Sequence, residues 1–122
     1  MVKKRLILLA SILFLLTAYA ENASQDYPTT GIASWYSTHT TASGEKFNDN
    51  DSTCAMRRYD FGKFYKVCNV ANGKCVVVRQ NDFGPSKYLY DKGRIIDLSK
   101  KAFSRIADLE EGIIKVTIEE QD

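Results

Sequence analysis

The stretch FYKVCNVANGKCVVVRQ, residues 64–80, carries the strongest local signal for structure in this chain. Two runs rich in β-branched and aromatic residues, 64–70 and 75–80, flank Asn72-Gly73, the dipeptide that most strongly marks a tight hairpin turn. A two-residue turn of this kind needs positive φ at both central residues, which asparagine and glycine tolerate. The stretch therefore predicts a β-hairpin with a two-residue turn.

Composition excludes several classes of protein. The chain has 122 residues, of which 44% are hydrophobic and 26% charged, which is typical of one globular domain and not of a disordered or polytopic membrane protein. Residues 1–20 combine a basic start, an apolar run over 6–16 and the small-residue end Ala18-Tyr19-Ala20, which predict a secretory signal cleaved after Ala20. The apolar run is shorter than the roughly 20 residues of a spanning helix. With no cysteine near the cleavage site to accept a lipid, we expect an exported protein, periplasmic or secreted, that is not a lipoprotein.

Charge gives no sign of a polyanionic partner. Three of the 17 basic residues lie in the predicted signal, so the mature chain has 14 basic against 15 acidic residues. This balance favours neither nucleic acid nor an anionic membrane surface.

Two of the three cysteines lie on the arms of the hairpin. With a two-residue turn, Val70 faces Cys75 and Cys68 faces Val77, so the cysteines share a face diagonally and need a small adjustment to bond. In an oxidising compartment we expect one disulfide, Cys68–Cys75 being the best pair, while pairing with Cys54 stays open. Three cysteines without a CxxC pair and one histidine match no usual zinc spacing, so we predict no metal site.

The remaining segments complete a small β-rich domain. Residues 21–30 are polar and predict an exposed leader, so the domain is expected over 31–122. Further strand patterns lie at 32–36, 94–98 and 114–118.

One helix is predicted among these strands. Ser99 is a candidate N-cap for a helix of about three turns that ends near Gly112, whereas residues 81–93 read as a loop. Five or six short strands with one helix favour a small closed β-barrel, because closure removes exposed strand edges.

Five motifs in series resemble the RlpA (rare lipoprotein A) family in their order and spacing. They are GIASWY at 31–36, TASGEKF at 41–47, VANG at 70–73, VVVRQNDFGP at 76–85 and RIIDLS at 94–99. The resemblance implies a mostly β fold, a small six-stranded double-psi β-barrel with one or two short helices, shared with expansins and barwin-like endoglucanases. It also implies an envelope protein that binds peptidoglycan, some relatives being lytic transglycosylases that leave 1,6-anhydro-muramic ends on peptide-free glycan.

The functional positions of the family are a glutamate in TA-[SN]-GE, a histidine in TAAH and an aspartate in ND-x-GP. Glu45 and Asp82 match the first and the third. The second falls on residues 53–56, where Met56 stands at the histidine position, and a thioether can neither shuttle a proton nor donate a hydrogen bond. The family's longer loop before TA-[SN]-GE, which carries its own histidine, is shortened here around His39.

The chemistry implied by the resemblance needs carboxyl groups. A carboxylic acid protonates the leaving glycosidic oxygen, and a base takes the proton from the sugar's own 6-hydroxyl. Asp82 is the candidate for both steps, because a strand end followed by Gly84-Pro85 would hold it rigidly; the alternative is an Asx-turn residue. Glu45 is the candidate second carboxylate, and its alternative is an exposed loop residue.

Five more residues are candidates for binding glycan. Tyr36 and Tyr88 offer aromatic faces that stack on pyranose rings. Arg79 and Arg94 suit muramyl carboxylates, with solvated surface arginines as the alternative. Asp97 lies where the likeness to endoglucanases and expansins places an acidic functional residue; alternatively it favours the start of the following helix.

The sequence thus supports two functions. The first is an endolytic peptidoglycan lytic transglycosylase with Asp82 as acid and base and Glu45 assisting. The second is a non-catalytic, expansin-like binding module, which Met56 and the shortened loop favour; an endoglucanase-type hydrolase is a third reading. In each case we expect a monomer whose partner is a polysaccharide, for the first two the peptidoglycan glycan strand, with no cofactor.

Overall fold

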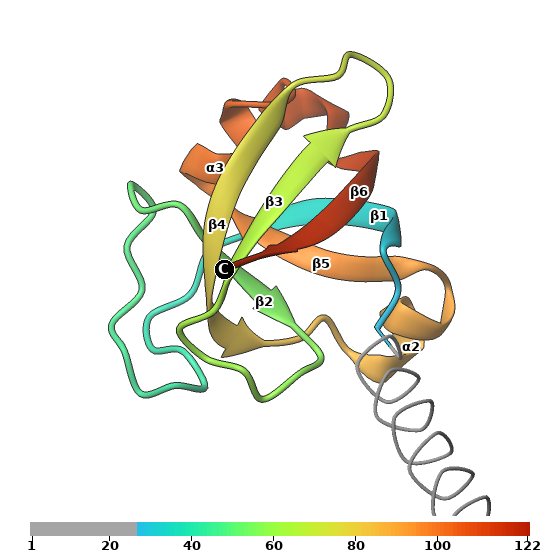
Figure 1. The fold of residues 1–122 in the computed structure, drawn as a ribbon. Helices are drawn as coiled ribbons and strands as arrows, with labels where there is room; N and C mark the ends of the chain where they lie inside the picture. Colours follow the sequence, from blue (N-terminus) through green and yellow to red (C-terminus); the bar gives the residue numbers. More distant parts are fainter. Residues whose placement is uncertain (1–26) are drawn as a thin grey trace, which may run out of the picture.

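The computed structural model describes residues 27–122, so the predicted signal at 1–20 and the leader residues 21–26 lie outside it (Figure 1). Within this range six strands close into a barrel in the order β1-β5-β2-β4-β3-β6. The strands are β1 Thr30–Tyr36, β2 Thr53–Met56, β3 Phe64–Asn69, β4 Cys75–Phe83, β5 Arg94–Ser99 and β6 Ile113–Gln121. The closed six-stranded barrel confirms the predicted fold class.

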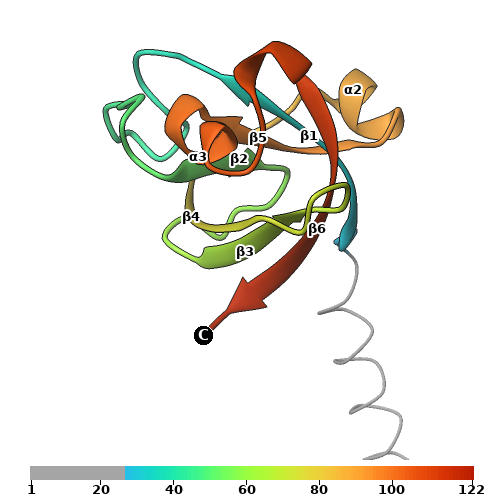
Figure 2. The ribbon, with the colours of Figure 1, turned by 90° about the horizontal axis from the view of Figure 1, so that it is seen from above.

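The barrel mixes two kinds of strand pairing. β1 pairs with β5 and β2 pairs with β4 in parallel, while the other neighbours are antiparallel. Closure pairs each of the six strands on both sides, so the sheet formed by residues 30–121 has no open edge. Two short helices, α2 Lys87–Asp91 and α3 Lys100–Ser104, lie on opposite sides of the barrel (Figure 2).

The core fills the barrel interior and extends under α3. Alternate residues of the strands are buried, as in β3, where Tyr65 and Val67 point inward between exposed neighbours. Phe103 of α3 and Ile106 are fully buried and join the same cluster. Tyr27 also packs against this cluster, and its hydroxyl donates to the Ile95 carbonyl, so the folded unit begins no later than Tyr27.

The hairpin of β3 and β4 is confirmed, but its predicted register is wrong. Cys68 pairs directly with Cys75, not diagonally, and the two form a disulfide with Cα atoms 4.0 Å apart. Cys54, buried in the core, is the free cysteine in the described part of the chain. The disulfide pairing is therefore as predicted.

The register differs because the turn is longer than two residues. The Asn69 N–H donates to the Lys74 carbonyl at 2.8 Å, which encloses four residues, and only Gly73 among these takes positive φ, at 75°. The side-chain amides of Asn69 and Asn72 both donate to the Ile106 carbonyl, at 2.8 and 2.9 Å. This tertiary anchor holds the wider loop, and local turn preference does not reveal it.

The segment predicted as a loop over 81–93 contains regular structure. β4 continues to Phe83, because its last residues pair with β2, where Phe83 is the partner of Met56. The Ser86 hydroxyl then caps α2 by accepting from the Leu89 N–H. All four residues of β2 are buried, so the strand has no alternating pattern and was not predicted.

The predicted three-turn helix is shorter. Ser99 is its N-cap, as predicted, and accepts from the Ala102 N–H at 3.3 Å, but α3 ends at Ser104. Asp108 then starts a separate 3-10 turn, Leu109–Glu111, with a capping box and an end at Gly112. The Ile106 carbonyl serves the hairpin loop instead of a continued helix.

We predict that the double replacement Cys68→Ser and Cys75→Ser lowers the free energy of unfolding by about 2 kcal/mol, because the bridge closes a short loop. Urea unfolding of the mature chain measures the loss. As a control, the folded wild type should expose no reactive thiol, and the unfolded protein one per chain, from Cys54. Three reactive thiols on unfolding would contradict the pairing.

Candidate functional site

Ala55 of β2 lies between two carboxylates. Its Cα partners are Asp82 on β4 and Asp97 on β5, and Asp97 in turn pairs with Ser34 on β1. Neighbouring strands lie about 4.8 Å apart, so the two aspartates are about 10 Å apart at Cα. Ser34, Asp97, Ala55 and Asp82 thus form a row across four strands, called the acidic row below. Ala55 is small and buried, so no bulky side chain separates the two carboxylates.

An irregularity in β4 sets the direction of Asp82. Gln80 pairs with Cys54 and Asp82 with Ala55, so Asn81 is an extra residue between them. Strict alternation from the fully buried Gln80 would point Asp82 into the barrel. The bulge turns the carboxylate onto the face of Ala55, a use of bulges that is common beside active sites.

Three donors hold the Asp82 carboxylate. Oδ1 accepts from the backbone N–H groups of Ala42, at 2.8 Å, and Phe83, at 2.9 Å. Oδ2 accepts from the Tyr36 hydroxyl at 2.9 Å. Burial, followed by this bond to Asp82, raises the pKa of Tyr36, so its phenol remains protonated and donates.

The loop that carries Glu45 runs beside the end of β4. Ala42 contacts Asp82, the Ser43 N–H donates to the Asn81 carbonyl at 3.3 Å, and Glu45 reaches Arg79. The sequence motif TASGE therefore forms one wall of the Asp82 site.

Glu45 and Arg79 form a bidentate ion pair. The guanidinium Nη1 and Nη2 donate to the two carboxylate oxygens at 2.9 and 2.6 Å. These hydrogen bonds from Arg79 lower the pKa of Glu45. Glu45 is therefore a fixed negative charge rather than a proton donor, and Arg79 is engaged within the protein.

Asp97 lies in the opposite electrostatic situation. Burial raises its pKa, while the Ser34 hydroxyl, which donates to Oδ1, and the charge of Arg94 act against that rise. The charge of Asp82 raises it further. Asp97 therefore holds a proton more strongly than an ordinary aspartate, whereas Glu45 holds one less strongly than an ordinary glutamate.

The structure brings most of the predicted residues together and leaves some elsewhere. Tyr36 and Asp82 are in contact, as are Glu45 and Arg79. Tyr88 is exposed on α2 beside Lys92, and within residues 27–122 no hydrogen bond, ion pair or ring contact joins it to this group.

Met56 and His39 lie in different surroundings. Met56 is fully buried in the core. His39 is exposed in its loop, where its carbonyl accepts from the Phe47 N–H.

Sequence reasoning missed two features of the site. One is Ser34, whose hydroxyl bond to Asp97 depends on the parallel pairing of β1 with β5. The other is an aromatic stack next to Asp82, in which Tyr59, 77% exposed, lies flat on Phe83 with ring centroids 4.6 Å apart. The aromatic residues of loop 59–61 were a signal that could have suggested it.

No helix between residues 27 and 122 has both the length and the apolar character needed to cross a membrane. Over the same range, no three His, Cys, Asp or Glu side chains gather closely enough to hold a metal ion.

Barrel and site together define a double-psi β-barrel with an acidic row across four strands. An expansin from Clavibacter michiganensis, solved in complex with cellohexaose, shares this fold, with a TM-score of 0.59 and 24% identity over 77% of this chain and 50% of its own. The family described as lytic transglycolase matches residues 28–118, and the chain belongs to that family.

Curated relatives carry the RlpA name and confirm the resemblance. The endolytic peptidoglycan transglycosylase RlpA of Rickettsia felis is 39% identical over 83% of this chain and 46% of its own length. The probable endolytic peptidoglycan transglycosylase RlpA of Synechocystis is 44% identical over 73% of this chain and 28% of its own. The chain thus spans less than half of the length of these relatives.

We predict that Arg79→Gln raises the pKa of Glu45 toward the ordinary glutamate value of about 4.3, because the two guanidinium hydrogen bonds are lost. NMR titration of the side-chain carboxyl measures the shift. The paired Glu45 contributes to stability above its unfolded pKa, and this contribution is lost as the pH falls through the lower folded pKa. The control, Arg58→Gln, should leave Glu45 unchanged; an unchanged pKa in Arg79→Gln would contradict the pair.

Proposed function

We propose that this domain is an endolytic peptidoglycan transglycosylase in which Asp82 is the acid and base. The observation that carries the proposal is the orientation of the Asp82 carboxylate. A bulge turns it to the outer face of the barrel, and three hydrogen-bond donors hold it there. Membership of the lytic transglycolase family and the printed names of the RlpA relatives support the same activity.

In the proposed reaction, the protonated Asp82 gives its proton to the glycosidic oxygen, and the bond from that oxygen to the anomeric carbon breaks. The resulting carboxylate then takes the proton of the 6-hydroxyl, whose oxygen bonds to the anomeric carbon. The products are a shortened strand and a 1,6-anhydro end, and Asp82 is protonated again.

The groups around Asp82 have different roles in the proposed reaction. Glu45, held ionised by Arg79, supplies negative charge that stabilises the oxocarbenium-like transition state. Asp97, whose burial favours the protonated form, is the carboxyl that keeps a proton close to the row. Tyr36 positions Asp82 through its hydroxyl, and Arg94 and Tyr88 remain predicted glycan contacts.

The alternative is an expansin-like module that binds glycan without cutting it. Met56 favours it, because this residue stands where the family motif has a histidine and a thioether cannot transfer a proton. Under the catalytic proposal, the Tyr36 hydroxyl supplies to Asp82 a hydrogen bond that a thioether cannot donate.

The proposal also places the protein outside the cytoplasm. Its substrate is the wall glycan, and a Cys68–Cys75 disulfide suits an oxidising compartment. The signal, the absence of a lipid anchor and the monomeric state remain predictions.

We predict that Asp82→Asn lowers glycan cleavage at least about 100-fold, because the amide can neither give nor take the proton. Its Oδ1 can still accept from Ala42 and Phe83, so the fold and glycan binding should persist. Mass spectrometry of fragments with 1,6-anhydro ends, released from sacculi and from amidase-stripped strands, measures cleavage, and pelleting with the glycan measures binding.

The matched control is Asp91→Asn, which alters an exposed aspartate on α2. Full cleavage by Asp82→Asn would remove this residue from the mechanism. Binding by the wild type with no fragments at all would establish the binding module instead.

A further inference from the structure

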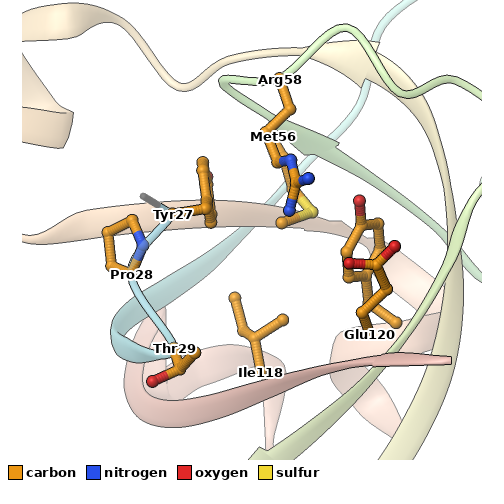
Figure 3. A pocket seen from close by; sticks show the side chains of 8 residues that line it. Tyr27, Pro28, Thr29, Met56, Arg58, Ile118 and Glu120 are labelled. Carbon is orange, nitrogen blue, oxygen red and sulfur yellow. The ribbon is translucent and has the colours of Figure 1, made fainter. Parts of the chain in front are cut away.

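A cavity of about 510 Å³ opens at one end of the barrel, where the described chain enters the fold (Figure 3). Inward-facing residues of β2, β3 and β6 form part of its wall. This mouth cavity is lined by Tyr27, Pro28, Thr29, Met56, Arg58, Tyr65, Ile118 and Glu120. Asp82, Glu45 and Asp97 are not among its lining residues, so it is distinct from the acidic row.

One lining residue has an unused polar group. Tyr65 is 1% exposed, and its hydroxyl has no hydrogen-bond partner in the described part of the chain. Buried hydroxyls are paired in the large majority of folded proteins. Burial raises the pKa of Tyr65 to about 12, so at neutral pH the group is a phenol that can both donate and accept.

Among residues 27–122, the charges at the cavity balance. Arg58 pairs with Asp60 at 2.8 Å, and Glu120 pairs with Lys63 at 2.5 Å. Two positive and two negative groups give no net attraction for an ionic ligand. The Arg58 pair uses Nη2 and the Glu120 pair uses Oε1, so further N–H donors and a carboxylate oxygen stay available for hydroxyl groups.

The rest of the wall is aromatic or apolar. The Arg58 guanidinium lies 5.5 Å from the centre of the Tyr27 ring and 5.9 Å from that of Tyr65. Figure 3 shows Met56 and Ile118 projecting toward the space between Tyr27 and Glu120. A ligand that suits this wall has hydroxyl groups at its edge and a hydrocarbon face, which is the chemistry of a pyranose ring.

We propose that the mouth cavity is a second saccharide site that takes one uncharged N-acetylhexosamine ring. Its volume lies within the 300–1,000 Å³ typical of small-molecule pockets. The inference rests on the proposed function in one respect, because N-acetylglucosamine is the uncharged sugar of the peptidoglycan strand. A glycan strand would then contact the domain at two separate places.

NMR titration of the labelled mature chain with N-acetylglucosamine tests the location. We expect the amide signals of Arg58, Ile118 and Glu120 to shift with one common dissociation constant. N-acetylmuramic acid should bind no more tightly, because the charges that residues 27–122 place at the site balance. Tenfold tighter binding of the carboxylate sugar would overturn the assignment of an uncharged ligand.

Two conservative variants test the roles of the residues. Tyr65→Phe removes only the unpartnered hydroxyl, so we expect binding to weaken about fivefold while thermal stability stays equal or rises. Glu120→Gln should also weaken binding several-fold. Glu119→Gln, which alters an exposed side chain outside the cavity lining, is the matched control and should bind like the wild type.

Three results would overturn the proposal. They are shifts confined to residues near Asp82, no shift at any sugar concentration, and a Tyr65→Phe variant that loses stability but not affinity. The cleavage assay on intact sacculi is independent of these readouts. Cleavage without binding at the mouth cavity would leave the proposed function standing and remove only this second site.

Discussion

The four residues of β2 are the part of the barrel on which the rest depends. All four are buried, and the strand joins β4 in parallel on one side and β5 in antiparallel on the other. Without this short strand the sheet would open between its two halves and expose two edges. Ala55, near its centre, also sets the spacing of Asp82 and Asp97, so the strand that closes the barrel also positions the two carboxylates of the site.

The site contains three carboxyl groups, and each has different neighbouring groups. Glu45 pairs with a guanidinium and stays ionised, Asp97 is half-buried and holds its proton more strongly, and Asp82 is oriented by a phenol and two backbone amides. Groups of one chemical type can serve different steps when their environments differ in this way. The partners that create the differences come from β1, β4, β5 and the loop of residues 41–45.

The prediction of the fold succeeded where a local pattern was strong. Alternation identified the strand at 114–118, short apolar stretches bounded by loop signals identified those at 32–36 and 94–98, and the Asn-Gly pair identified the hairpin. It failed where tertiary contacts replace local preference. The Ile106 carbonyl, for example, accepts hydrogen bonds from the side chains of Asn69 and Asn72. These bonds hold the wider hairpin loop, and α3 ends before Ile106, at Ser104. β2 was missed because a strand that is buried on both faces has no alternation.

For the site, the sequence alone was enough to identify the family and to select Asp82, Glu45 and Asp97 as candidate carboxyl groups, and it favoured the Cys68–Cys75 disulfide while leaving pairing with Cys54 open. These follow from motifs and spacings that are local in the chain. Tertiary contacts alone show that Tyr36 donates to Asp82, that Arg79 pairs with Glu45 and that Ser34 donates to Asp97. They also place the Tyr65 hydroxyl, which has no hydrogen-bond partner among residues 27–122, in a cavity that residues of β2, β3 and β6 line. Each of these facts joins residues from different strands or loops, and strand order, register and the bulge at Asn81 place them together.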